Sequence, residues 1–275
     1  MQGQGTALVT GASRGLGRAI SLELARRGYD VIACVRDLAS ANGLVEQAEH
    51  LSGTIRLQKL DMAALGEFRV PDNLRILINN AGYRGPYLPI EETSMDEWRR
   101  TFETNFFGLI DLTRRAIPAL RNAGDGIICN IGSMGAYMPM PFYTTYRASK
   151  LALTAISEGL RIELAPFGIR VIEIPIGGVD TDMLRTSIAN RPPEAIDYER
   201  YRPMAEQHAA MPAQIRSRVI SADDAARNVV DQLEVAGPLK RACDPNAQIQ
   251  LAELSTSTEE SRAQALFARF GAAPA

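Results

Sequence analysis

Residues 6–17 read TALVTGASRGLG, a short apolar run followed by a turn with glycine at positions 11, 15 and 17. The run predicts a buried strand over residues 6–10, and apolar residues recurring every four positions predict a helix over 14–27. Glycines between a strand and a helix let a pyrophosphate approach the backbone, and the helix start offers free amides to that anion. This stretch therefore predicts a dinucleotide-binding domain.

The rest of the chain repeats this alternation of strand and helix. Further strands are predicted at residues 30–35, 55–60, 74–78, 126–131 and 169–174, with a last short one at 239–243. Helices are predicted at 95–121, disturbed at Pro118, and at 143–165 and 222–235. We expect an α/β fold: a single Rossmann-type, doubly wound domain over residues 1–275, with a parallel sheet of about seven strands and helices on both faces. Residues 183–220 are predicted to form a substrate loop or lid, because they are too many for an ordinary connection.

Composition excludes several classes of protein. The chain has 275 residues, 46% of them hydrophobic, and a net charge of −2, which is typical of a globular domain without a basic surface for nucleic acid. Its two histidines and three cysteines are scattered, so no metal site is expected. We see no signal peptide and no apolar run of about 18 residues, and we expect a cytoplasmic protein with no membrane contact.

Tyr146 and Lys150 form the one tyrosine–lysine pair at this spacing in the chain, and it lies at the start of a predicted helix. Residues four apart share a helical face. A free phenol has a pKa of about 10, too high for efficient proton exchange at neutral pH, and a nearby ammonium group lowers it. The pair therefore predicts a general acid/base at Tyr146 whose pKa is tuned by Lys150.

Three motifs resemble the short-chain dehydrogenase/reductase family: T-G-x-x-x-G-x-G at residues 10–17, N-N-A-G at 79–82 and Y-x-x-x-K at 146–150. The resemblance extends to about residue 183 and implies an oxidoreductase that interconverts a ketone or aldehyde and an alcohol by hydride transfer. It further implies that Ser133 hydrogen-bonds the substrate oxygen, that Lys150 also holds the nicotinamide ribose, and that Asn105 holds a water linking the lysine to solvent. The expected catalytic residues are Asn105, Ser133, Tyr146 and Lys150.

An arginine after the second strand favours NADP(H) over NAD(H), because it accommodates a 2′-phosphate where NAD enzymes carry an acidic residue. Arg36 has this place, and Arg14 in the glycine turn is a second cation suited to phosphate, although the neighbouring Asp37 weakens the case. With the resemblance, the expected cofactor-binding residues are Gly11, Ser13, Arg14, Gly15, Leu16, Gly17, Arg36, Asp61, Met62, Asn80, Ala81, Gly82, Tyr146, Lys150, Val179 and Thr181.

The family's P-G-x-V-x-T motif is altered here. Residues 176–181 keep its glycine, valine and threonine, but Ile176 replaces the proline and Pro175 stands one place earlier, which leaves the local backbone path open. Hydride transfer favours a dry site. We expect an apolar pocket for a hydrophobic carbonyl compound or alcohol, lined by Met134, Met138, Met140, Pro141, Phe142, Tyr83 and part of residues 183–220.

Two other functions stay open: an NADP(H)-sensing protein without turnover, and a dehydratase or epimerase on the same scaffold. A serine hydrolase is disfavoured, since Ile131 stands where the motif G-x-S-x-G requires a glycine before Ser133. The resemblance also implies a homodimer or homotetramer formed through the faces of residues 95–121 and 143–165.

Overall fold

The computed structural model describes residues 5–189, 194–210 and 218–269. Within them, six strands form one parallel sheet in the order β3-β2-β1-β4-β5-β6. The predicted doubly wound architecture is confirmed, with six strands in place of about seven. The strands are β1 (Thr6–Thr10), β2 (Asp30–Val35), β3 (Thr54–Lys59), β4 (Leu74–Asn79), β5 (Ile127–Ser133) and β6 (Arg170–Ile176).

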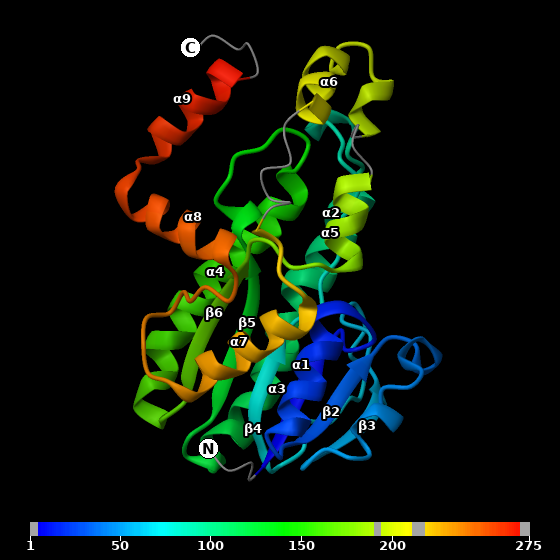
Figure 1. Ribbon diagram of the computed structural model, residues 1–275, viewed down its shortest axis with the longest axis vertical. Helices are drawn as coiled ribbons and strands as arrows, with labels where there is room; N and C mark the ends of the chain where they lie inside the picture. Colours follow the sequence, from blue (N-terminus) through cyan, green and yellow to red (C-terminus); the bar gives the residue numbers. More distant parts are fainter. Residues whose placement is uncertain (1–4, 190–193, 211–217, 270–275) are drawn as a thin grey trace.

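Helices cover both faces of the sheet (Figure 1). Helices α1 (Gly15–Arg26) and α7 (Ala222–Glu234) share one apolar core with Val9 and Ile78. Helices α3 (Gly108–Ala123) and α4 (Thr144–Leu164) share the other core with Leu8 and Leu77. Because alternate residues of a strand point to opposite faces, two covered faces require the continuous apolar runs seen in the sequence.

The predicted strand at residues 239–243 is wrong. Only Lys240 forms a β-bridge, to Glu173 of β6. The pairing comprises one hydrogen bond from the Glu173 amide to the Leu239 carbonyl (2.8 Å) and one from the Arg241 amide to the Glu173 carbonyl (3.0 Å). It extends no further because Asp244 turns away to cap the next helix, α8 (Pro245–Thr256).

The helix predicted over residues 95–121 is interrupted, but not at Pro118. It consists of α2 (Met95–Phe102), a π-helical turn η4 (Glu103–Phe107) and α3, which runs through Pro118 without a break. Pro118 is exposed, so the carbonyl that its ring leaves unpaired can bind water. The irregularity lies at η4, where the extra residue of a π-turn changes the direction of Asn105, as such turns often do at functional sites.

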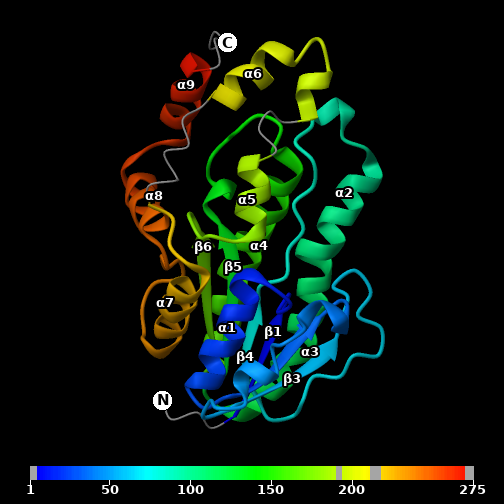
Figure 2. The same cartoon turned by 45° about the vertical axis from the view of Figure 1, so that its right-hand side comes forward.

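Shorter helices lie beyond the carboxyl end of the sheet (Figure 2). They include α5 (Asp182–Ala189), the single turn η7 (Glu194–Asp197) and α6 (Arg202–Ala210), all within the predicted lid. Residues 190–193 and 211–217 of that segment lie outside the described residues, and its action as a lid stays a prediction. A final helix, α9 (Glu259–Arg269), follows α8.

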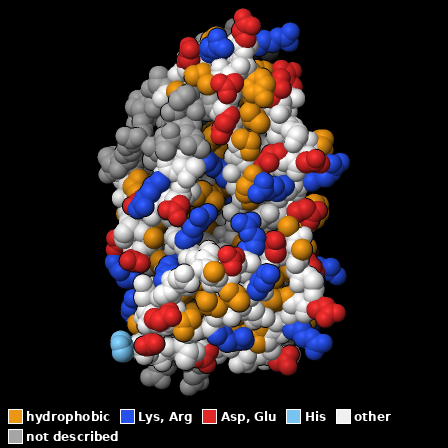
Figure 3. Space-filling view, turned by 90° about the vertical axis from the view of Figure 1, so that its right-hand side faces the viewer, with side chains coloured by type: hydrophobic (Ala, Val, Ile, Leu, Met, Phe, Trp, Pro, Cys, Tyr) orange, Lys and Arg blue, Asp and Glu red, His pale blue; other side chains and the backbone are white. Residues whose placement is uncertain are grey.

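The described surface is mixed in charge. On the face shown in Figure 3, positive and negative side chains are interspersed with apolar ones, as a net charge of −2 predicts. No helix in the described part of the chain has the length and apolar character needed to span a membrane. Phe107 and Ile162 are 52% and 76% exposed on the segments expected to associate, but the oligomer stays a prediction.

Candidate active site

The glycine turn packs directly against the segment that follows β4. Gly11 has a φ of +66°, and a Cβ there would lie 2.9 Å from the Cα of Ala81. A Cβ at Gly17 would lie 2.3 Å from the side-chain nitrogen of Asn80, which donates to the Thr10 carbonyl at 2.9 Å. Since β1 and β4 flank the point where the strand order reverses, this crevice is where such a sheet binds a nucleotide.

The start of α1 fits a pyrophosphate. Arg14 occupies the N-cap without a side-chain cap bond, so the first amides of the helix stay free for an anion. The Leu16 side chain is buried in the core, which leaves only its backbone to face a ligand. The predicted cofactor residues Gly11, Gly17, Asn80 and Ala81 are thus brought together, with Ser13 and Gly15 in the same turn.

The predicted phosphate-binding arginines are exposed. Arg36 follows β2 directly, and the Arg14 Nε lies 3.8 Å from a carboxylate oxygen of Asp182. Asp37 accepts a hydrogen bond from the Ala39 amide (3.1 Å) and so caps the turn that follows it. Asp61 likewise accepts from the Ala63 amide at 3.0 Å, beside the buried Met62.

The altered segment after β6 is held by a residue that sequence reasoning missed. The carboxylate of Asp244 accepts hydrogen bonds from the amides of Gly177 and Gly178, each at 2.9 Å. Val179 is buried, and Thr181 lies against the glycine turn, 3.4 Å from where a Gly15 Cβ would be. The available signal was Asp244 itself, which precedes Pro245 as an N-cap precedes a first-turn proline.

Tyr146 and Ser133 meet at the carboxyl end of β5. Tyr146 is 7% exposed near the start of α4, and burial raises its pKa. A hydrogen bond with the Ser133 side chain lowers the pKa in turn, although the net direction is upward. Ser133 also accepts from the Gly135 amide at 3.1 Å. The two side chains predicted to contact the substrate oxygen therefore lie next to each other, while their roles toward a substrate stay predictions.

Lys150 lies beneath them, 4% exposed, with its Nζ 5.9 Å from the centre of the Tyr146 ring. The ammonium donates to the Ile131 carbonyl at 2.9 Å. Burial lowers the Lys150 pKa to about 8, against the attraction of Glu173. The tuning of Tyr146 by this lysine stays a prediction, and the charge of Arg84 also lowers the pKa of Tyr146.

The side chain of Asn105 connects η4 to the segment after β4 through hydrogen bonds. Its side chain accepts from the Tyr83 amide (2.7 Å) and donates to the Tyr83 carbonyl (2.8 Å) and the Ser149 hydroxyl (2.9 Å). A Cβ at Gly82 would lie 3.7 Å from the Lys150 Nζ and 3.8 Å from the Asn105 oxygen. Asn105 and Gly82 thus lie beside Lys150, while the water-holding role of Asn105 and the cofactor-binding role of Gly82 stay predictions.

A buried carboxyl group lies behind Lys150 and was not foreseen. One oxygen of Glu173 accepts from Thr154 (2.8 Å) and Tyr137 (3.1 Å), and the other has no partner in the described part of the chain. Burial raises the pKa of this carboxyl group. The one feature of the sequence that could have indicated this buried carboxyl group is the single glutamate within the apolar strand RVIEIPI.

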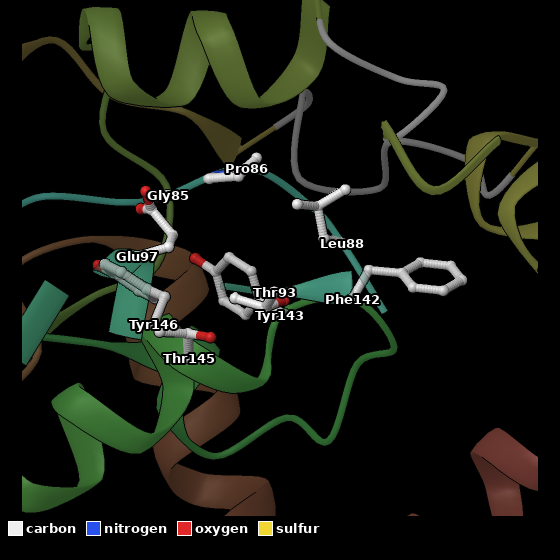
Figure 4. A pocket seen from close by; sticks show the side chains of 9 residues that line it. All are labelled: Gly85, Pro86, Leu88, Thr93, Glu97, Phe142, Tyr143, Thr145 and Tyr146. Carbon is white, nitrogen blue, oxygen red and sulfur yellow. The ribbon is translucent and has the colours of Figure 1, made fainter. Parts of the chain in front are cut away.

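Two cavities lie near the residues expected to line an apolar pocket. Phe142 lines a cavity of about 10 Å³ with Tyr143 and Tyr146, and Figure 4 shows Glu97 of α2 in the same wall. Met134 and Met138 instead line a mainly apolar pocket of about 420 Å³ whose opposite wall is formed by α8 and α9. Among the described residues these predicted lining residues thus face two different cavities, and a single pocket for a hydrophobic substrate stays a prediction.

Comparisons with known proteins agree on one family. Residues 5–192 match the family model described as short chain dehydrogenase. An uncharacterized oxidoreductase of Bacillus subtilis is 37% identical over 198 residues, 67% of this chain and 68% of the relative. An NADPH-dependent 1-acyldihydroxyacetone phosphate reductase of Saccharomyces cerevisiae is 34% identical over 233 residues, 79% of this chain and 77% of that protein. A short chain dehydrogenase of Burkholderia cenocepacia, solved in complex with NADP, aligns with a TM-score of 0.71 and 28% identity over 98% of this chain and 99% of its own.

Proposed function

The chain belongs to the short-chain dehydrogenase/reductase family of oxidoreductases, and on that premise we propose that it reduces a hydrophobic ketone or aldehyde with NADPH, or oxidises the corresponding alcohol with NADP⁺. The observation that carries the proposal is the cluster of the half-buried Ser133 with the buried Tyr146 and Lys150, near the segment that packs on the glycine turn. Tyr146 supplies a proton donor, Ser133 a hydrogen-bond donor and Lys150 a cation, all at the edge of the proposed nucleotide crevice. Carbonyl reduction by a bound nicotinamide requires these three groups close together.

Each residue of the cluster has a separate task. Because the pKa of Tyr146 is raised, its phenol is protonated at neutral pH and can donate that proton to the carbonyl oxygen. Ser133 donates a second hydrogen bond to the same oxygen and stabilises the charge that develops on it. NADPH, when bound, would supply the hydride that converts the carbonyl carbon to the alcohol. Lys150 would hold the cofactor ribose and provide positive charge beneath the phenol.

The preference for NADP(H) rests on Arg36 and Arg14 together with two comparisons. The yeast relative is NADPH-dependent by name, and the Burkholderia structure was solved with NADP. Asp37 does not compete for the ribose in this geometry, since its carboxylate caps the following turn. A guanidinium at Arg36 is suited to bind a 2′-phosphate, whereas a carboxylate there would repel it.

Arg36→Asp should shift the cofactor preference toward NADH. We expect the ratio of kcat/KM for NADPH to that for NADH to fall about a hundredfold, because a phosphate partner is lost and a carboxylate suited to the 2′-hydroxyl is gained. Arg56→Asp, at another exposed arginine on the neighbouring strand β3, is the control and should leave the ratio unchanged. An unchanged ratio in Arg36→Asp would assign the arginine to the surface alone.

The function as a whole is tested in two steps with the wild-type protein. NADPH is first titrated by its fluorescence, and oxidation of NADPH is then followed with aromatic, steroid-like and aliphatic ketones. We expect binding and turnover with at least one class. Tight binding without turnover on ketones and alcohols would favour an NADP(H) sensor. A product formed with no net change in reduced nicotinamide would favour a dehydratase or epimerase.

A further inference from the structure

Arg84 is a half-buried cation next to the proposed catalytic cluster. It follows Gly82 by two residues, and Gly82 faces the Lys150 Nζ. The segment from Tyr83 to Tyr87 leaves the carboxyl end of β4 and is fixed at both ends. Asn105 binds the backbone of Tyr83, while the Tyr87 amide donates to a Glu194 oxygen at 2.8 Å. Arg84 is therefore held at the edge of the site by a positioned backbone.

A row of three neighbouring tyrosine rings connects Arg84 to Tyr146. The guanidinium lies 4.6 Å from the centre of the Tyr87 ring and donates to the Tyr87 hydroxyl. Tyr87 is stacked on Tyr143 with ring centres 5.5 Å apart, and Tyr143 is 5.0 Å from Tyr146. The positive charge lowers the pKa of both Tyr143 and Tyr146, so its field reaches the place of the reacting oxygen.

The charge of Arg84 has no carboxylate partner in the described part of the chain. Among other partly buried or buried arginines, Arg27, Arg75 and Arg115, whose side chains are 30%, 23% and 32% exposed, each bind a carboxylate. Arg147, Arg170 and Arg241 bind no carboxylate in the described part of the chain, but each donates to backbone carbonyls. Arg84 differs from both groups, since its hydrogen bond within the described residues is to the neutral Tyr87 hydroxyl.

Two acidic side chains that contact the segment from Tyr83 to Tyr87 have donors of their own: Glu97 accepts from the Tyr83 hydroxyl, and Glu194 accepts from the Tyr87 amide. One oxygen of Glu97, buried against Gly85, has no hydrogen-bond partner in the described part of the chain.

A partly desolvated cation without a counter-ion is unfavourable unless something supplies the opposite charge. A guanidinium with one side on an aromatic ring keeps donors free for a planar or tetrahedral anion, and it binds carboxylate and phosphate with two parallel hydrogen bonds. Lys150 adds a second positive charge, with its Nζ 5.9 Å from the centre of the Tyr146 ring. Both charges favour a substrate whose negative group lies a few bonds from its carbonyl.

Building on the proposed function, we propose that Arg84 determines specificity by binding a carboxylate or phosphate group of the carbonyl substrate. The substrate is then an anionic ketone or aldehyde, with its apolar part directed elsewhere in the site. The anion fixes the carbonyl between Ser133 and Tyr146, and Arg84 itself takes no part in hydride or proton transfer.

The test compares matched pairs of carbonyl compounds that differ in the anion alone. Acetoacetate and levulinate are set against their methyl esters, and dihydroxyacetone phosphate against dihydroxyacetone, which separates a carboxylate from a phosphate. In Arg84→Met we expect kcat/KM for the preferred anion to fall about 10- to 100-fold, mostly through KM, while the neutral partner changes less than about threefold. Arg84→Lys should recover part of the loss. Arg100→Met is the control, because Arg100 stacks on Tyr83 at 4.3 Å but belongs to exposed α2.

Two outcomes overturn the proposal: an equal loss for the anion and its neutral partner in Arg84→Met, or a wild-type protein that prefers the esters. Thermal unfolding with each compound gives a readout independent of turnover. If no compound oxidises NADPH but an anion raises the Tm of the wild type and not of Arg84→Met, the proposed function fails and the anion site stands. If no anion raises the Tm and none is reduced better than its neutral partner, Arg84 binds no anion.

Discussion

Tyr146→Phe should lower kcat for carbonyl reduction by about 10²- to 10⁴-fold while leaving NADPH affinity nearly unchanged. The substitution removes only the hydroxyl, and the ring that packs on Tyr143 at 5.0 Å remains. The reacting oxygen would keep the Ser133 hydrogen bond but lose its proton donor, so charge would build up on it uncompensated. Stopped-flow measurement of NADPH oxidation with fluorescence titration of NADPH separates the two quantities.

Tyr143→Phe is the matched control. Tyr143 is a buried tyrosine three residues earlier whose pKa burial raises well above its ordinary value, so it shares the environment of Tyr146. We expect it to retain most activity, because its ring is kept and its hydroxyl has no proposed role in proton transfer. Equal losses in both variants would show that the phenol of Tyr146 has no special role, and full activity in Tyr146→Phe would remove it from the mechanism.

The positions of the strands were predicted well from the sequence, because each strand is marked by a run of apolar residues that are neighbours in the chain. Apolar runs between turn residues located all six strands to within two residues of their observed ends. The prediction of a seventh strand was wrong because a run such as Leu239–Cys243 becomes a strand only if it stays hydrogen-bonded along a neighbouring strand, here β6. Here the hydrogen bond from the Gly177 amide to the Asp244 carboxylate draws the chain away after one bridge. That contact joins residues 67 positions apart, and no local pattern contains it.

The residues of the candidate site also fall into those that a local pattern predicts and those that it does not. The glycines of the turn, Tyr146 and Lys150 could be predicted because their spacing alone brings them to one turn or one helix face. Arg84 and Glu173 were missed because their importance depends on partners: an arginine matters here through an absent counter-ion, and a glutamate through complete burial. Spacing also places Lys150 on the correct face of its helix, but it shows neither that the ammonium binds the Ile131 carbonyl nor that the charge of Arg84 reaches Tyr146.

Lys150→Met should have effects of opposite sign on activity and stability. Activity should fall about a hundredfold or more, because the cofactor ribose and the phenol both lose a cation. Burial lowers the Lys150 pKa from 10.5 to about 8, which at about 1.4 kcal/mol per pKa unit is an unfavourable contribution of about 3 kcal/mol to the folded state. The lost hydrogen bond to Ile131 offsets about 1 kcal/mol of the gain. The free energy of unfolding at pH 7 should therefore rise by about 2 kcal/mol.

The pH dependence distinguishes this account from a purely structural role for the lysine. The unfolded chain binds one more proton than the folded chain between pH 8 and 10.5, so the penalty is full below pH 8 and disappears as the pH rises through this range. The stability advantage of Lys150→Met should accordingly shrink in denaturant titrations at higher pH. The wild-type rate of reduction should fall above pH 8 as the ammonium is lost, and the residual rate of the variant should show no step there.

Lys240→Met is the control. It removes the lysine bound to Glu158 at 3.1 Å, and it should neither lower the activity nor raise the free energy of unfolding. Joint loss of activity and stability in Lys150→Met would mean that the amine holds the fold together, because a buried charge kept only for chemistry must destabilise the protein that carries it.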